Sequence, residues 1–520
     1  MTSSEPAAQP RETPAALPRN VIVILLDSLN RRMLGAYGGG EFETPNLDRL
    51  AARSVRFDRH YAGSLPCMPA RHDILVGALD FLWRPWGSIE VWEQSVVRSL
   101  LLAGVTTKLV SDHPHLFETG GENYHTDFSA WDYQRGHEDD PWRTRPDPSW
   151  TGAPALPAEP SPHTRHYDTS RTWFRDEEDF PGARTMRAAT EWLEGAAPAA
   201  DRFLLFVDEF DPHEPFDTPE PWASRYDPDW EGPRLIWPPY STDTIAGGVL
   251  TERQARHIRA AYGSKLSFVD HWLGRLLDVM DRDDRWSDTA VVLCTDHGHY
   301  LGERDYFGKP GVPVFPEMGH IPLLVAWPGA AARTVDALTT SVDIHATLCD
   351  VFGVAGGDHR THGRSLVPLL SGAAQSVRER LLTGIWGRHV QVVDRDRMYA
   401  RAPSGDNFPL AMWSNRWSTM PIHAMPQVTL PRPDRRAALA YPPGSDVPVI
   451  RQPFAPGDML PFWGIGTPPD DHHLYDLGED PAAAHNLSGT RAEAEALDAL
   501  RAALDEVEAP AEQLARLGVG

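Results

Sequence analysis

The chain has few cysteines, no long apolar run and no excess of basic residues. Its three cysteines among 520 residues are too few and too scattered for a disulfide framework; they are Cys67, Cys294 and Cys349. No window reaches the apolar length of a membrane span, and the first residues lack the apolar centre of a secretion signal. We therefore expect a soluble cytoplasmic protein with no membrane partner and a disordered leader over residues 1–19.

The charge balance of the chain is strongly acidic. Lys and Arg number 49 against 73 Asp and Glu, so the formal net charge is −24. Nucleic-acid-binding proteins usually present a basic face, so we expect no nucleic-acid partner. An anionic substrate would need a local cationic pocket to draw it into this repelling field. The length and the 41% share of hydrophobic residues indicate a globular protein with a large core.

Continuous apolar runs alternate with helical patterns along the chain. The runs are rich in β-branched residues and leucine, as expected of strands buried on both faces of a parallel sheet; they are Val21–Leu26, Arg202–Val207, Thr289–Leu293 and Ile321–Ala326. Helical patterns cover Leu250–Met280 and Thr44–Ser54, where Thr44 is a candidate N-cap and Pro45 the first helical residue. This alternation predicts an α/β fold with a large, mostly parallel sheet sandwiched by helices.

Two long stretches break this alternation. Residues 136–177 and 403–456 are crowded with proline and charge, and we expect both to be surface excursions. A turn at Pro368–Gly372 suggests a domain boundary near residues 371–376. This boundary predicts a catalytic domain over residues 20–375 and a smaller C-terminal α+β domain over residues 376–520.

Polar side chains follow two of the predicted strands at their carboxyl ends. Asp27 follows the first strand, and Asp296-His297-Gly298 follows the strand that ends at Cys294. Open α/β sheets bind ligands at this edge, so two carboxylates and an imidazole can converge there on one divalent cation. Taken singly, Asp27 is also typical of a helix N-cap, and the Asp-His-Gly segment of a simple turn.

A short motif between these segments carries the most specific signal. Cys67-Met68-Pro69-Ala70-Arg71, followed by Leu75-Val76-Gly77, resembles the signature of the type I (formylglycine-dependent) sulfatase family. Further segments resemble parts of that family in the same order along the chain: Asn20–Asp27, Thr44–Leu50, Thr295–Gly298, Leu301–Glu303, Lys309, Ile321–Pro322, Trp327–Gly329, Ser341–Leu348 and His473–Leu477. The resemblance covers nearly the whole chain and implies the alkaline-phosphatase-like fold of the alkaline phosphatase superfamily.

The resemblance implies a modified nucleophile. Cys67 would be oxidised after translation to formylglycine by a formylglycine-generating enzyme. The hydrated aldehyde is a geminal diol, of which one oxygen attacks the ester and expels the alcohol. The second hydroxyl then drives elimination, which returns the aldehyde and releases the inorganic anion; a serine has no such second hydroxyl. One divalent metal ion, Ca²⁺ or Mn²⁺, would be held by Asp27, Cys67, Asp296 and His297.

Three more side chains match catalytic positions of the family. Arg71, one helical turn after Cys67, can fix the diol and screen the developing anion, with a surface salt bridge as the alternative. His213 matches the histidine near the leaving-group oxygen, as a general acid or an electrostatic clamp. Lys309 matches the lysine that contacts the sulfuryl or phosphoryl oxygens. Taken singly, His213 is also typical of a solvated or turn-stabilising loop residue, and Lys309 of a solvated surface lysine.

The metal segment departs from the family pattern. Many sulfatases carry two adjacent acids after the first strand, whereas this chain has Asp27-Ser28. His297 stands where a number of calcium sulfatases carry asparagine. Fewer carboxylates and an added imidazole shift the expected metal from Ca²⁺ towards Mn²⁺.

A second departure affects the substrate pocket. The family's Gly-Lys-Trp-His segment is replaced by residues 111–115, whose sequence is Ser-Asp-His-Pro-His. We expect His113 to cover part of the missing catalytic role, with structural service to the loop as the alternative for both histidines. Asp112, in place of the lysine, can discourage a doubly anionic group or recognise a cationic substrate tail.

We therefore interpret the chain as a sulfatase that hydrolyses a small-molecule sulfate monoester to an alcohol and inorganic sulfate. A phosphonate monoester or phosphodiester hydrolase with the same site is the alternative enzyme. A non-catalytic metal-binding relative is the alternative from another class, but the retained site residues speak against it. Two-domain members of this family often oligomerise through the C-terminal region, so we also consider a homo-oligomer.

Overall fold

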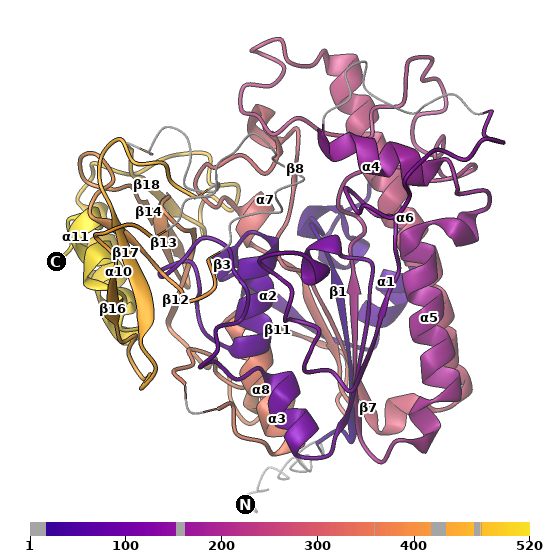
Figure 1. Ribbon diagram of the computed structural model, residues 1–520, viewed down its shortest axis with the longest axis horizontal. Helices are drawn as coiled ribbons and strands as arrows, with labels where there is room; N and C mark the ends of the chain where they lie inside the picture. Colours follow the sequence, from indigo (N-terminus) through magenta and orange to yellow (C-terminus); the bar gives the residue numbers. More distant parts are fainter. Residues whose placement is uncertain (1–16, 152–161, 358, 418–432, 462–468, 470) are drawn as a thin grey trace, which may run out of the picture.

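The computed structural model describes residues 17–151, 162–357, 359–417, 433–461, 469 and 471–520 (Figure 1). Most of the leader expected over residues 1–19 lies outside the described residues. Within the described part of the chain, no helix is both long enough and apolar enough to cross a membrane.

A large sheet forms the centre of the molecule. Among the described residues it contains eight strands in the order β11-β2-β10-β7-β1-β6-β4-β5. Their bounds are β1 Asn20–Leu26, β2 Val55–Tyr61, β4 Thr106–Ser111, β5 Ala130–Tyr133, β6 Phe203–Glu209, β7 Thr289–Cys294, β10 Leu323–Ala326 and β11 Arg333–Thr340. All pairings are parallel except those of β10 with β2 and β7. The predicted α/β fold with a mostly parallel sheet is confirmed.

The direction of β10 is the one departure within this sheet. The run Ile321–Ala326 predicted a strand like its neighbours, but the strand begins at Leu323 and runs antiparallel to them. A strand buried on both faces has the same continuous apolar pattern in either direction, so the run could not reveal this orientation.

Helices cover both faces of the sheet, as Figure 1 shows. Alternate residues of β1 point to opposite faces, because the side-chain period of a strand is two. Ile22 and Ile24 pack in one core cluster with helices α1 (Pro45–Ala51), α5 (Pro181–Gly195) and α6 (Glu252–Arg282). Val21 and Val23 pack in another with α2 (Cys67–Val76), α3 (Val96–Leu102) and α8 (Val342–Phe352). The predicted sandwich of helices around the sheet is therefore present.

The start of α1 is fixed from outside the helix. Thr44 occupies the N-cap and Pro45 the first helical position, as predicted, but the Thr44 side chain makes no capping hydrogen bond. The carboxylate of Asp270 on α6 instead accepts from the backbone amides of Asn46 (3.1 Å) and Leu47 (2.7 Å). These are two of the amides that a helix N-terminus leaves without an internal partner, so α6 caps α1.

A second, smaller sheet lies beside the large one. Its order is β18-β14-β13-β12-β3, with bounds β3 Ser64–Leu65, β12 Arg380–Ile385, β13 Val390–Asp394, β14 Arg397–Arg401 and β18 His473–Asp476. Helices α10 (Ala492–Glu506) and α11 (Ala511–Leu517) pack in the core of this region. Strand β3 comes directly before α2 and pairs with β12, so the N-terminal half of the chain contributes to this sheet. The domain boundary near residues 371–376 stays a prediction.

Both stretches expected to be surface excursions contain ordered elements. Residues 136–177 include α4 (Pro162–Arg171), and Tyr167 and Phe174 join the core cluster of α5 and α6. Residues 403–456 contribute a three-stranded sheet of β15 (Leu410–Trp413), β17 (Val449–Phe454) and β16 (Ala438–Ala440). Residues 418–432 of this stretch lie outside the described residues.

The buried imidazole of His60 on β2 predicts a loss of stability in acid. Burial lowers the pKa of His60 to about 3, and its Nδ1 lies 3.0 Å from Thr339 Oγ1. The group is neutral in the folded state and becomes protonated on unfolding below the unfolded pKa of about 6.5. Its contribution is therefore complete above that pKa and is lost as pH falls towards 3, by up to about 1.4 kcal/mol per pH unit. We expect the midpoint of thermal unfolding to fall between about pH 7.5 and about pH 5.5.

In the variant His60→Gln, the midpoint of thermal unfolding should fall less than in the wild type over the same pH interval. His485→Gln is the matched control, because the side chain of His485 is 86% exposed. An identical pH response in His60→Gln and the wild type would contradict the assignment.

Candidate active site

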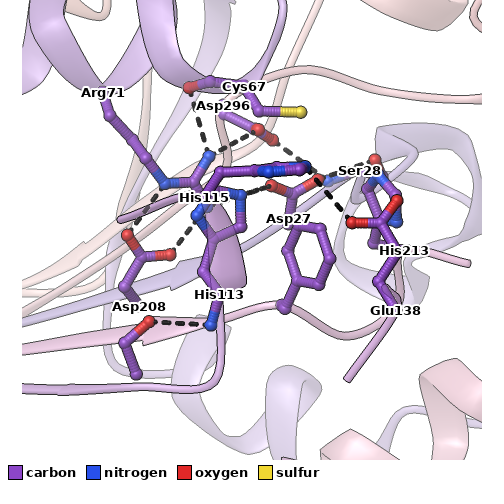
Figure 2. Close-up of polar contacts among 12 residues, drawn as sticks. Asp27, Ser28, Cys67, Arg71, His113, His115, Glu138, Asp208, His213 and Asp296 are labelled. Atoms are coloured by element: carbon purple, nitrogen blue, oxygen red, sulfur yellow. Dashed lines mark hydrogen bonds and ion pairs between the residues drawn. The ribbon is translucent and has the colours of Figure 1, made fainter. Parts of the chain in front are cut away.

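Four predicted metal ligands meet at the carboxyl edge of the large sheet. Figure 2 shows three of them, Asp27, Cys67 and Asp296. Asp27 follows β1, Asp296 and His297 follow β7, and Cys67 is the first residue of α2. One ligand atom from each of these four buried side chains lies within 4.8 Å of all the others. Strands β1 and β7 are parallel neighbours, so their ends bring these side chains to one edge.

The orientation of the group is set by short local hydrogen bonds. His297 Nδ1 donates to the carbonyl oxygen of Gly298 (2.8 Å), which leaves Nε2 with its lone pair, 3.3 Å from Cys67 Sγ. Asp296 Oδ1 accepts from the amides of His297 (2.8 Å) and Ser28 (3.0 Å). Ser28 has a left-handed backbone with φ of 60°, an uncommon conformation for serine that delivers its amide to this carboxylate.

Ser28 does not replace the missing second acid by adding a free oxygen. Its hydroxyl donates to Asp27 Oδ1 (2.8 Å), so it supports the one carboxylate that is present. The other oxygen of Asp27, Oδ2, is buried and accepts no hydrogen bond. This oxygen faces the charged groups of the site, with Arg71 Nη2 at 3.0 Å and His113 Nε2 at 3.8 Å.

The electrostatics of the group favour a bound cation. Burial and the neighbouring Asp296 carboxylate raise the pKa of Asp27 well above its usual range. Burial also acts to raise the pKa of Asp296, but His297 and Arg71 outweigh it and lower that pKa. Two facing carboxylates in a dry site repel each other, and a divalent ion would remove that repulsion. A donor set that combines carboxylate oxygens with an imidazole nitrogen suits Mn²⁺, whereas Ca²⁺ prefers sites made only of oxygen atoms.

Arg71 is buried at the centre of the site and is no surface salt bridge. Its side chain is 1% exposed, and Nη1 lies 2.9 Å from Asp296 Oδ2 while Nη2 lies 3.0 Å from Asp27 Oδ2. Nε and Nη2 also donate to the two oxygens of Asp208, at 2.8 and 2.6 Å. A bidentate pair of this kind fixes the plane of the guanidinium.

Asp208 is a site residue that our sequence analysis missed. It belongs to an acidic run, Asp208-Glu209-Phe210-Asp211, in which composition does not show which acid faces the site. The register decides, because Asp208 pairs with Leu25 of β1 and Glu209 with Leu26. Leu25 packs in the cluster of α2 and Leu26 in that of α5 and α6, so alternation turns only Asp208 towards Arg71.

Lys309 and His213 form a coupled pair beside Cys67. Lys309 Nζ lies 3.9 Å from Cys67 Sγ and donates to His213 Nε2 at 2.5 Å. His213 Nδ1 donates to the carbonyl oxygen of Glu214 (2.7 Å), and burial lowers the pKa of His213 to about 3. The imidazole is therefore neutral here, and its Nε2 accepts a hydrogen bond from the lysine ammonium.

Glu214, another residue missed from the sequence, holds this pair in place. Its carboxylate lies 3.4 Å from His213 Nδ1, 3.9 Å from Lys309 Nζ and 3.3 Å from His299 Nε2, and it also accepts from the Tyr240 hydroxyl. The signal in the sequence was its place next to His213. A neighbour in sequence does not reveal which way its side chain points.

His113 lies at the edge of the metal group, and the neighbouring Asp112 is fully buried. His113 Nε2 is 3.8 Å from Asp27 Oδ2, and neither of its ring nitrogens has a hydrogen-bond partner. Burial and Arg71 lower the pKa of His113 well below its usual range, so the ring is neutral. Asp112 Oδ1 instead accepts from the Phe210 amide (2.8 Å), and its carboxylate interacts electrostatically with His137.

The buried pair of Arg71 and Asp208 predicts a large stability effect. Asp208→Ala removes two charge-assisted hydrogen bonds and leaves part of a buried guanidinium unpaired, so we expect a loss of about 3 kcal/mol or more in the free energy of unfolding. The measurement is the shift of the thermal unfolding midpoint. Asp201→Ala is the control, because the Asp201 side chain is 89% exposed in its pair with Arg19, and it should cost less than about 1 kcal/mol. Equal shifts in the two variants would contradict the structural role of Asp208.

Comparison with known proteins agrees with this geometry. The sulfatase family model matches residues 19–354. A choline-sulfatase of Rhizobium meliloti is 28% identical over 389 residues, which cover 69% of this chain and 72% of that protein. The multifunctional alkaline phosphatase superfamily protein PehA of Trinickia caryophylli is 26% identical over 417 residues, covering 68% and 77% of the two chains.

The solved structures that resemble this fold include both reaction types considered above. The phosphonate monoester hydrolase of Agrobacterium radiobacter superposes with a TM-score of 0.60 at 19% identity, covering 93% of this chain and 95% of that one. A 2-O GAG sulfatase superposes with a TM-score of 0.59 at 17% identity, covering 94% and 91%. The alkaline-phosphatase-like fold is thus confirmed. The chain belongs to the sulfatase family, and the expected enzyme class, a sulfuric ester hydrolase, is confirmed with it.

Proposed function

We propose that this enzyme hydrolyses a small-molecule sulfate monoester to an alcohol and inorganic sulfate, with a formylglycine formed from Cys67 as its nucleophile. The observation that carries the proposal is the convergence of Asp27, Asp296, His297, Arg71 and Lys309 on the first residue of α2. An unmodified thiol would be a poor nucleophile there, because burial and Asp27 raise the pKa of Cys67 well above its usual range.

Asp27, Asp296, His297 and the oxidised side chain of residue 67 would hold one divalent ion. When bound, such an ion acts as a Lewis acid that stabilises negative charge on the reacting group. Asp27 Oδ2, which accepts no hydrogen bond, and His297 Nε2, which keeps its lone pair and faces Cys67 Sγ, support this assignment. His113 Nε2, 3.8 Å from that oxygen, stands close enough to contact either the ion or a sulfuryl oxygen.

Three further buried side chains would have separate roles in the reaction. Arg71 holds Asp27 and Asp296 in place and balances the negative charge of the site. Lys309 is placed to bind a sulfuryl oxygen, because its Nζ lies 3.9 Å from Cys67 Sγ. His213 Nε2 accepts a hydrogen bond from Lys309, so the shared proton is held on the Lys309 ammonium, and this pair could act as a general acid or as an electrostatic clamp at the departing alcohol oxygen.

A phosphonate monoester or phosphodiester is the alternative substrate. Both are monoanions like a sulfate monoester, and the site offers one lysine where the family's second lysine is absent. The phosphonate monoester hydrolase with the same fold supports this alternative. Formylglycine-generating enzyme as a maturation partner, a homo-oligomer and a cytoplasmic location also stay predictions.

The first test is the chemical state of residue 67. Trypsin releases His60–Arg71 as one peptide, whose mass should match an aldehyde or its hydrate in protein from the native host. This protein should hydrolyse aryl sulfates faster than phenylphosphonate esters in the presence of Mn²⁺ or Ca²⁺. Cys67→Ala should reduce kcat roughly a thousandfold or more. An unmodified thiol throughout, or faster turnover of the phosphonate, would overturn the proposed reaction.

The metal assignment has a test that does not depend on turnover. After removal of metal with a chelator, the wild type should bind about one equivalent of Mn²⁺ in calorimetry, more tightly than Ca²⁺. Asp27→Asn should weaken Mn²⁺ binding at least about tenfold. Asp350→Asn, at an exposed position of α8, is the control and should bind like the wild type. Unchanged affinity in Asp27→Asn would remove Asp27 from the metal site.

A further inference from the structure

A loop that follows β5 approaches the site from outside the family motifs. Its residue Glu138 has a left-handed backbone with φ of 42°, which is uncommon for a residue with a side chain. The loop is held firmly on both sides of Glu138. Arg135 pairs with Asp140 (2.6 Å), and His137 Nε2 lies 2.7 Å from Asp211 Oδ1. Strained residues that their surroundings hold in place cluster at binding sites.

The carboxylate of Glu138 belongs to a group of acidic side chains around the imidazole of His115. Glu138 Oε2 lies 3.2 Å from His115 Nε2, and Glu118 Oε2 lies 3.1 Å from His115 Nδ1. Two carboxylates thus flank one imidazole. They raise the pKa of His115 well above its usual range although burial acts against them.

Glu138 lies on the leaving-group side of the site. Figure 2 shows it beside His213, and its carboxylate interacts electrostatically with His213 and Glu214. The Glu138 carboxylate also interacts electrostatically with the Tyr240 side chain, whose ring centroid lies 5.6 Å from Lys309 Nζ. Glu138 and Tyr240 retain exposures of 15% and 46%, whereas Cys67 and the rest of the reacting centre are almost fully buried. These two residues are therefore on the side from which solvent reaches the site.

We propose that Glu138 and Tyr240 form a subsite for a cationic group on the alcohol part of the substrate, so that the preferred ester is that of an alkylammonium alcohol; this rests on the proposed function. A carboxylate near a partly exposed aromatic ring is a combination that binds alkylammonium groups. Such an ester is a zwitterion with no net charge, so the acidic field of the protein does not repel it. Glu138 thus takes the role that the sequence suggested for Asp112.

The test compares two sulfate esters of equal shape. One is the sulfate ester of choline, and the other is its neutral isostere, with a tert-butyl group in place of trimethylammonium. The wild type should prefer the cationic ester at least about tenfold in kcat/KM. Glu138→Gln keeps the size of the side chain and removes its charge, and it should reduce this ratio about tenfold. The matched control is Glu191→Gln, which removes an exposed carboxylate on α5 outside this group (its side chain is 68% exposed) and should leave the ratio unchanged.

Each outcome separates this inference from the proposed reaction. Aryl sulfate hydrolysis without preference between the two alkyl esters would overturn the cationic subsite and leave the proposed reaction standing. A preference that survives Glu138→Gln would overturn the assignment to Glu138. If no sulfate is cleaved, calorimetry with choline itself decides: the wild type should bind it about tenfold more tightly than Glu138→Gln, and absence of binding would overturn the subsite.

A second metal ion is the competing occupant. His115, Glu138 and Asp139 each offer one ligand atom within 4.8 Å of the others, so a divalent ion fits there by distance. Elemental analysis of wild type and Glu138→Gln distinguishes the two cases. The inference expects the same metal content in both proteins, and loss of one equivalent in the variant would overturn it.

Discussion

One buried guanidinium holds the active-site edge of this protein together. Arg71 meets Asp27, Asp208 and Asp296, which stand at the ends of the adjacent strands β1, β6 and β7. Three carboxylates this deep could not stay ionised without a cation, and a buried cation could not stay without them. The ion pairs of Arg71 therefore both hold α2 on the sheet and balance the charge of the site. The raised pKa of Asp27 indicates that one guanidinium does not fully neutralise the three acids.

The second sheet is joined to Cys67 by only a few residues. Strand β3 pairs with β12, and α2 begins two residues after that strand ends. The position of Cys67 is therefore fixed from two directions, by Arg71 beneath it and by β3 before it. Because all ten residues of α2 are buried, there is no free side on which the helix could shift.

The sequence predicted those parts of the molecule that follow from local patterns. The apolar runs gave the strands, and Asp27, Asp296 and His297 stood out because they directly follow two of them. Asp208 was missed because it lies inside an acidic run, where only the pairing register reveals the inward face. Glu138 was missed because its stretch has no period, so that nothing local relates it to the site. The direction of β10 also depends on tertiary pairing, which the composition of the strand does not reveal.

The depth of Cys67 has a consequence for how the enzyme is made. The side chain is 4% exposed and is enclosed by α2, β3 and the carboxyl edge of the sheet. An enzyme that oxidises this cysteine must bind the backbone around it, which the folded chain does not present. The oxidation that we propose for Cys67 would therefore come before folding, while the segment from β3 to α2 is still an extended peptide. The order of biosynthetic events, and not the redox state of the finished protein, would decide whether a given molecule can ever become active.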